Sequence, residues 1–193
     1  MSGRIIATDY ISLDGVIEDP VGMENSGLGD WTGPFSRGPL GDKFKLEELT
    51  VAEALLFGRL TYDGFAAVWP SVKDEAGFAD RMNSLPKYVA SRTLKKASWN
   101  ATTVIGHDLV AKAKALKSKH DGDILIYGSA SIVHVLAPHG LVDEYRLMIY
   151  PTLLGRGKRL FAANATSRLT LSECRQFDDG IVLLCYRATP PSN

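Results

Sequence analysis

The sequence predicts an α/β domain of three layers, in which a mostly parallel central sheet is flanked by helices and carries a C-terminal antiparallel hairpin. Along most of the chain, short apolar segments rich in β-branched residues alternate with amphipathic segments. This order builds a parallel sheet that is covered on both faces. The last two strand-like segments are joined by Asp179-Gly180, a pair that favours a tight hairpin turn. We therefore expect the hairpin at one edge of an otherwise parallel sheet.

Length and composition fit one ordinary globular domain. The 193 residues include 22 Lys and Arg against 22 Asp and Glu, so the formal net charge is zero. No linker-like stretch or internal repeat divides the chain, and we expect one domain over residues 1–193. The balanced charge argues against a nucleic-acid partner, because affinity for phosphate backbones depends on surplus Lys and Arg. No signal-peptide segment or membrane-length apolar run occurs, so we expect a cytoplasmic protein without a membrane partner.

The first part of the chain predicts a strand, a long loop and a helix. Arg4–Ser12 is rich in β-branched residues and predicts the first strand, which ends at the turn pair Asp14-Gly15. The segment 18–41 is rich in glycine and proline and predicts a long irregular loop, a feature that is more often functional than idle. The apolar spacing of 42–50 then predicts a helix with Asp42 as a plausible N-cap.

The same alternation continues to the C-terminal hairpin. We expect strands at 54–57, 87–90, 102–105, 124–127 and 144–150. We expect helices at 61–68, 78–84, 109–119 and 129–136. The hairpin is expected to join Leu169–Phe177 to Ile181–Ala188.

The only two cysteines of the chain, Cys174 and Cys185, fall on the two strands of this hairpin. With a turn centred on Asp179-Gly180, the two residues lie directly opposite each other, which makes a cross-strand disulfide geometrically conceivable. Two reduced thiols suit a cytosolic chain better. The four histidines are scattered without the spacing of metal ligands, so we expect no metal site.

Three of the predicted strands end in residues that suit phosphate groups. These segments are Gly58-Arg59-Leu60-Thr61, Ser91-Arg92-Thr93 and Gly128-Ser129-Ala130-Ser131. Glycine lets a phosphate approach the backbone, arginine offers a charged fork, and helix N-termini offer free N–H groups. Each segment alone favours a structural interpretation, as a tight turn, a solvated charge or a helix cap. Their common position at one sheet edge favours a dinucleotide with an extra phosphate, although no Gly-x-Gly-x-x-Gly fingerprint is present.

The order of the motifs resembles that of a known superfamily. The segments Ser12–Ile17, Phe57–Tyr62 and Lys87–Leu94 resemble the dihydrofolate-reductase-like superfamily. The segments Leu141–Leu147 and Pro151–Phe161 are similar to one branch of it, the reductase domain of the bifunctional riboflavin-biosynthesis deaminase-reductase. The chain lacks the zinc motif of the deaminase, so it resembles single-domain relatives of the reductase part.

This resemblance implies NADPH as the cofactor and gives the three strand-end segments separate roles. Arg59 and Thr61, next to Gly58, would lie at the adenine-side phosphates and the pyrophosphate. Ser91 and Arg92 would hold the 2′-phosphate that distinguishes NADPH from NADH. The pyrophosphate would be lined by the remaining segment, Gly128, Ser129, Ala130 and Ser131.

The residues on the substrate side have two readings each. Folate-type reductases place a carboxylate in the first long helix, and Asp42 is the candidate for that role, with a helix N-cap as the alternative. Asp14 is either a turn residue or the substrate contact that the riboflavin branch implies. Trp31 and Trp69 could stack on a planar ring or pack against the domain.

The expected function is that of an NADPH-dependent reductase of a small heterocyclic substrate, similar to the 5-amino-6-(5-phosphoribosylamino)uracil reductase of riboflavin biosynthesis. A dihydrofolate or pteridine reductase is the second enzymatic reading. A nucleotide-binding module that senses its ligand without catalysis is the non-enzymatic one. Relatives with these motifs are often dimers, and we expect a homodimer.

Overall fold

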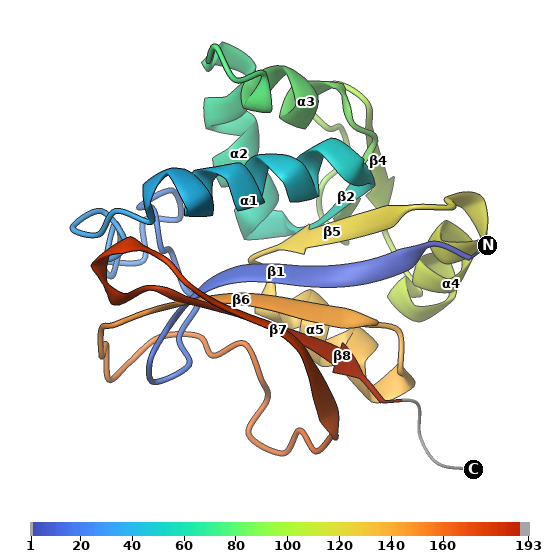
Figure 1. Cartoon of the computed structure of the whole chain (residues 1–193). Coiled ribbons are helices and arrows are strands. Elements are labelled where there is room, and N and C mark those ends of the chain that lie inside the picture. Colours follow the sequence, from blue (N-terminus) through green and yellow to red (C-terminus); the bar gives the residue numbers. More distant parts are fainter. Residues whose placement is uncertain (1, 190–193) are drawn as a thin grey trace.

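A computed structural model describes residues 2–189, and its eight strands form a single sheet with the order β4-β3-β2-β5-β1-β6-β8-β7 (Figure 1). Neighbouring strands run parallel from β4 to β6: β4 (Thr102–Ile105), β3 (Lys87–Ala90), β2 (Ala52–Gly58), β5 (Asp123–Tyr127), β1 (Arg4–Ser12) and β6 (Glu144–Tyr150). The last two strands pair antiparallel: β8 (Val182–Ala188) and β7 (Leu169–Gln176). The predicted α/β fold, mostly parallel with a C-terminal antiparallel hairpin, is confirmed.

Helices cover both faces of the sheet, as Figure 1 shows. One face carries α1 (Gly38–Val51), α2 (Arg59–Val68) and α3 (Phe78–Ser84), and the other carries α4 (Leu109–Lys119) and α5 (Ala130–Leu136). Successive residues of β1 serve the two faces in turn, because Ile5 and Ala7 pack against α4 and α5 whereas Ile6 packs under α1 to α3. This is why the strand reads as a continuous apolar run.

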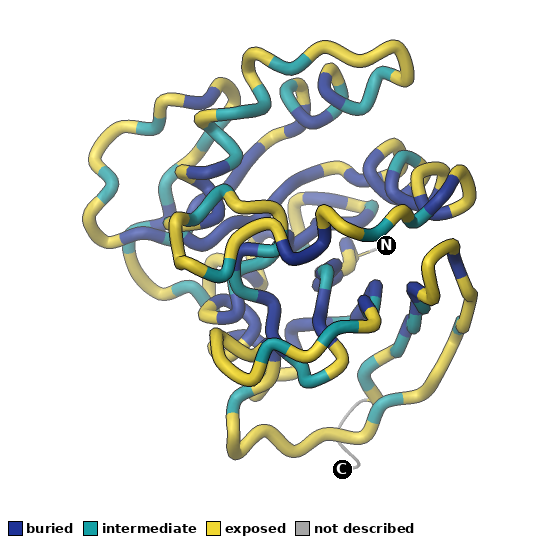
Figure 2. The backbone as a smooth tube through the Cα atoms, turned by 90° about the vertical axis from the view of Figure 1, so that its left-hand side faces the viewer, coloured by how far each residue is buried: buried dark blue, intermediate teal, exposed yellow. Residues whose placement is uncertain are grey.

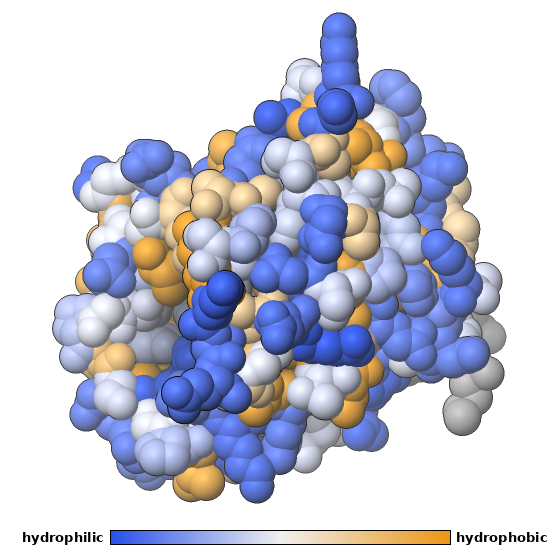
Figure 3. Space-filling model, turned by 90° about the horizontal axis from the view of Figure 1, so that it is seen from above, coloured by the Kyte–Doolittle hydropathy of each residue, from blue (hydrophilic) through white to orange (hydrophobic). Residues whose placement is uncertain are grey.

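The polar and exposed parts of the molecule concentrate in its loops and on the outer faces of its helices. Figure 2 looks onto the edge where β1 ends and shows buried strands behind largely exposed loops. Seen from above, the outer face of α1 to α3 mixes hydrophilic side chains with smaller apolar areas (Figure 3). A third buried cluster, around Trp31, Phe44 and Phe177, packs the loop before α1 against the neighbouring strands β6 and β8.

The helix α1 begins four residues earlier than the sequence predicts, at Gly38, so Asp42 is not its N-cap. Pro39 lies in its first turn, where the fixed φ of proline suits a helix and its missing N–H would be unpaired anyway. The Asp42 side chain lies at the surface, where it is 67% exposed. The N-cap interpretation of Asp42 is therefore wrong.

The hairpin has a different register from the predicted one. Its loop has three residues, Asp178–Gly180, so Glu173 pairs with Cys185 while Cys174 pairs with Leu184. A shift of one residue turns a side chain to the opposite face of the sheet. Cys174 is accordingly exposed and Cys185 is buried, and both are free thiols. The prediction that the two cysteines lie opposite each other is wrong.

Within residues 2–189, no helix is long and apolar enough to cross a membrane.

Candidate functional site

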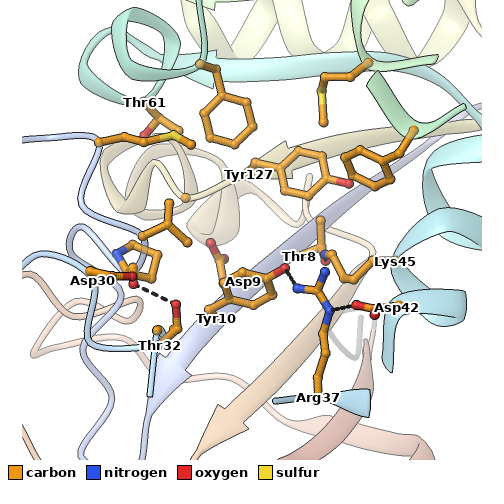
Figure 4. A pocket seen from close by; sticks show the side chains of 18 of the residues that line it. Thr8, Asp9, Tyr10, Asp30, Thr32, Arg37, Asp42, Lys45, Thr61 and Tyr127 are labelled. Atoms are coloured by element: carbon orange, nitrogen blue, oxygen red, sulfur yellow. Dashed lines mark hydrogen bonds and ion pairs between the residues drawn. The ribbon is translucent and has the colours of Figure 1, made fainter. Parts of the chain in front are cut away.

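A cavity of about 970 Å³ opens where β1 and β5 reach their carboxyl ends. Its walls come from these strands, from the loop before α1, and from α1, α2 and α3. Figure 4 shows part of the wall from close by. Open α/β sheets bind ligands at this edge, and small-molecule sites have volumes of roughly 300–1,000 Å³. The position and size of the cavity therefore fit a site for small molecules.

The most unusual group in the wall is the carboxyl group of Asp9, on β1. The residue is only 4% exposed, and its Oδ2 atom has no hydrogen-bond partner. Burial raises the pKa of Asp9 to about 8, while the charge of Lys45 and the backbone N–H of Gly128 act in the opposite direction. At pH 7 this carboxyl group is mostly protonated, so it can donate a hydrogen bond or a proton into the cavity.

A second group of polar side chains lies at the rim, where α1 begins. The guanidinium group of Arg37 donates hydrogen bonds to Tyr10 Oη and, over 2.6 Å, to Asp42 Oδ1 (Figure 4). Burial raises the pKa of Tyr10, so its phenol stays neutral. Asp42 thus lines the rim of the cavity as an exposed carboxylate that is paired with Arg37. It is not a buried acid of the kind that would bind a heterocycle.

Lys45 projects from α1 toward the cavity, but its charge is already balanced. Its ammonium group contacts Glu48 Oε1 and lies 3.1 Å from Thr8 Oγ1. Arg146, on β6, approaches the same carboxylate at 3.5 Å. Because Glu48 is almost completely buried, removal of both cations would leave it as an unpaired buried charge, which is strongly destabilising. The group holds α1 against the sheet.

Two of the three predicted phosphate segments meet where β2 and β5 end. Ser129 Oγ accepts a hydrogen bond from Gly58 N at 2.8 Å and donates one to Tyr127 O at 3.0 Å. A Cβ atom at Gly58 would lie 3.3 Å from Ser129 Oγ, and one at Gly128 would lie 3.1 Å from Thr61 Oγ1. A side chain at either position would crowd these hydroxyl groups, and the φ of +55° at Gly128 is a further reason for glycine there. Ala130 and Ser131 begin α5 directly after this junction.

The third segment lines a separate hollow of about 370 Å³. Ser91, Arg92 and His107 lie in its wall, and Ser131 joins them from α5. Ser131 Oγ would be 3.5 Å from a Cβ at Gly58, so this hollow lies beside the glycine junction. Ser91 Oγ accepts hydrogen bonds from the Thr93 and Leu94 amides, which shape the turn and leave Arg92 exposed.

The other predicted site residues lie outside both cavities. Arg59 is paired with Asp63 on the outer face of α2, with 2.6 Å between Nε and Oδ2. Trp31 packs in the core against Tyr150, and its Nε1 donates to the Glu18 carbonyl. Trp31 thus packs against the domain, as one of the two interpretations expects, and it does not line the large cavity.

Asp14 serves as an anchor between loops. Its carboxylate accepts hydrogen bonds from the Ser12 hydroxyl and from the Leu154 and Gly155 amides. These bonds, led by the one from Ser12, lower the pKa of Asp14 to about 2. The side chain ties the turn after β1 to the loop after β6, and it does not line the cavity.

Asp9 and Tyr127 are among the cavity residues that the sequence analysis did not single out. Asp9 occupies the same face of β1 as Ile5, Ala7 and Ile11, all of which are buried. A carboxylate in the inward register of a buried strand is rare unless it is paired or functional. That pattern was the available signal for Asp9, whereas nothing in the sequence separates Tyr127 from an ordinary core tyrosine.

Comparison with known proteins identifies the family. The model of the RibD C-terminal domain matches residues 4–183, which is nearly the whole chain. The chain belongs to the RibD C-terminal domain family. The chain is 32% identical over 187 residues to the uncharacterised protein YyaP of Bacillus subtilis, and the match covers 95% of this chain and 94% of YyaP.

Solved structures agree on the fold. RibD of Acinetobacter baumannii superposes with a TM-score of 0.68 at 17% identity, over 97% of this RibD C-terminal domain and 58% of that chain. Dihydrofolate reductase of Enterococcus faecalis, solved with NADP(H), gives a TM-score of 0.57 at 12% identity, over 96% of both chains. The fold is therefore one that reductases use. In the part of the chain that the structure describes, no group of three His, Cys, Asp or Glu residues could hold a metal ion.

Proposed function

We propose that this protein is an NADPH-dependent reductase of a small heterocyclic substrate. The observation that carries the proposal is the arrangement of two hollows at one sheet edge. The large cavity and the Arg92 hollow lie on either side of the junction at which Gly58 faces Ser129 and Ser131. A dinucleotide with a 2′-phosphate has the same three parts in order: a ring, a diphosphate and a second charged end.

The residues at the junction fit a diphosphate. Gly58 and Gly128 leave the backbone accessible where a Cβ atom would contact Ser129 or Thr61. No side chain caps the N-terminus of α2, a helix of ten residues, so its first N–H groups are free to bind an anion. Thr61 lies in the first turn of α2 and lines the large cavity. Its hydroxyl donates to Glu24 Oε1 at 3.0 Å, and this carboxylate must turn away when phosphate binds.

Arg92 and Ser91 would hold the 2′-phosphate, since an exposed guanidinium beside a hydroxyl suits a phosphomonoester. When bound, NADPH supplies a hydride from its nicotinamide ring. The chain then has to position the substrate and keep water away. Apolar side chains such as Phe65 and Met82 in the cavity wall serve the second need, and Asp9 holds the proton that reduction of a polar double bond requires.

Titration with NADPH and NADH, each followed by nicotinamide fluorescence, tests the cofactor assignment. We expect the protein to bind NADPH at least tenfold more tightly than NADH. Arg92→Ala should weaken NADPH binding by roughly 10- to 100-fold, the effect of one lost charged hydrogen bond, and should barely change NADH binding. Arg168→Ala is the matched control, because it removes an equal exposed charge beside β7, at the far edge of the sheet.

Equal affinity for the two cofactors in the unaltered protein would contradict the assignment. The chemistry is tested separately, by following NADPH absorbance in the presence of pterins, aminouracils and small carbonyl compounds. Oxidation of NADPH by one of these substrates supports a reductase. Tight NADPH binding without any oxidation would instead support the nucleotide-sensing module.

A further inference from the structure

In the described part of the chain, the buried side-chain polar atoms without a hydrogen-bond partner belong to residues that line the large cavity. Within residues 2–189, the buried side-chain nitrogen and oxygen atoms without a hydrogen-bond partner are Asp9 Oδ2, Trp69 Nε1 and Tyr127 Oη. All three residues line the large cavity. Buried polar groups in folded proteins are almost always paired, so three unpaired groups around one cavity indicate that a ligand completes them. Asp9 and Tyr127 are each more than nine-tenths buried.

Burial keeps Asp9 neutral, and the charges around it are too well paired to reverse this effect. From α1, Lys45 and Glu48 both act on it, but they are paired with each other, and Arg146 of β6 adds its charge to Glu48. From β5, Tyr127 stays protonated, because burial and the nearby Glu48 carboxylate raise its pKa well above the usual range. On β1 itself, Tyr10 is neutral for the same reason. Lys45 favours the Asp9 carboxylate, but its pairing with Glu48 leaves this effect smaller than that of burial.

The remaining charges of the wall argue against an anionic ligand. Each basic residue of the wall already has an acidic partner: Arg37 has Asp42, Lys45 has Glu48, and Lys43 has Glu47. Carboxylates outnumber these bases, and those at the wall besides Asp9 are Asp19, Glu24, Asp30, Asp42 and Asp74. A phosphate ester carries a charge of roughly −1.5 to −2 and would find no free cation to bind.

We propose that the large cavity takes a planar heterocycle without phosphate or net negative charge, which the buried Asp9 carboxyl group and the Tyr127 hydroxyl bind through hydrogen bonds. The protonated carboxyl group offers one donor and one acceptor, so it matches a ring edge with a bare nitrogen or carbonyl next to an N–H group. Trp69 adds a further N–H donor at the wall. That this ligand is the substrate rests on the proposed reductase function. The proposal excludes a phosphoribosyl compound as that substrate.

Isothermal titration calorimetry without any cofactor tests the proposal with a matched pair of probes, 6-hydroxymethylpterin and its phosphate monoester. We expect the unesterified pterin to bind at least tenfold more tightly than the ester at pH 6.5. Equal or tighter binding of the ester would overturn the proposal, and so would the absence of binding by both probes.

Variants at the floor of the cavity test the role of Asp9. Between pH 6.5 and 9.5, binding of the unesterified pterin should weaken about tenfold in the unaltered protein, because Asp9 loses its proton. Asp9→Asn keeps the shape, one donor and one acceptor. The ring N–H of the pterin also ionises in alkaline solution, so binding to the variant should weaken less than binding to the unaltered protein, which loses the Asp9 proton as well. Tyr127→Phe should weaken binding a few-fold at every pH, and Asp80→Asn, an exposed carboxylate on α3, is the control for charge.

A pH profile of pterin binding that is the same in Asp9→Asn and in the unaltered protein would overturn the assignment of Asp9. Circular dichroism confirms that each variant is folded. Because no cofactor is present, these results are independent of the NADPH titration. Failure of NADPH to bind would defeat the proposed function and leave the pterin result standing.

Discussion

Two aspartates at the end of β1, Asp9 and Asp14, are five residues apart and behave in opposite ways. Asp9 is buried in the cavity wall with one unpartnered oxygen, and its pKa is raised to about 8. Asp14 accepts hydrogen bonds from one hydroxyl and two amides, and its pKa is lowered to about 2. A carboxylate with its bonds satisfied within the chain holds loops together, whereas one left unsatisfied in a cavity is available to a ligand.

The largest expected effect is the change that Asp9→Asn makes to the pH dependence of stability. The folded pKa of Asp9 lies above the unfolded value of 3.8, so the folded protein keeps a proton that the unfolded chain loses between pH 4 and 8. Stability therefore falls as pH rises through this window, by about 1.4 kcal/mol per pH unit for one proton. Asp9→Asn removes this slope. Urea unfolding at pH 5, 6 and 7 measures it, and parallel pH curves for the two proteins would mean that Asp9 is not neutral.

An intermediate effect of opposite sign is expected at Asp14. Its folded pKa lies below 3.8, so its hydrogen bonds stabilise the protein above that value and lose their effect as pH falls through about 2. Asp14→Asn should lower the melting temperature by a few degrees at pH 7, and the difference should shrink toward pH 2. Thermal unfolding monitored by circular dichroism measures both. An unchanged melting temperature at pH 7 would show that the carboxylate is dispensable to the loops.

The smallest effect is expected at Asp42, the carboxylate that the sequence pointed to. It is two-thirds exposed and forms a rim pair with Arg37. Such pairs contribute at most about 1 kcal/mol, so Asp42→Asn should lower the free energy of unfolding by no more than this amount. Its effect on binding of the unesterified pterin should stay below about threefold at pH 6.5. A loss of about tenfold or more would instead assign the role of ligand-binding acid to Asp42 on α1.

The alternation of apolar segments was enough to predict the layers and the strand-end position of the phosphate segments. Those features depend on local periodicity and on where parallel strands end. The hairpin register and the start of α1 were wrong, because a three-residue loop and the first-turn proline Pro39 each outweighed the stronger-looking local signal. The inward register of Asp9 on a buried strand was a signal in the sequence, but its cavity and its neighbours Lys45 and Gly128 come from segments far apart in the chain and needed the structure. The homodimer stays a prediction.

Asp9 is the residue on which the proposed chemistry and the proposed ligand class both depend. Carbon-13 NMR of protein labelled at the aspartate carboxyl carbons follows each carboxyl group directly, with Asp9→Asn and Asp14→Asn providing the resonance assignments. We predict that the Asp9 resonance titrates near pH 8, and that the Asp14 resonance in the same sample titrates near pH 2. An Asp9 resonance that titrates near pH 4 would show an ordinary ionised carboxylate in the cavity and would contradict the account.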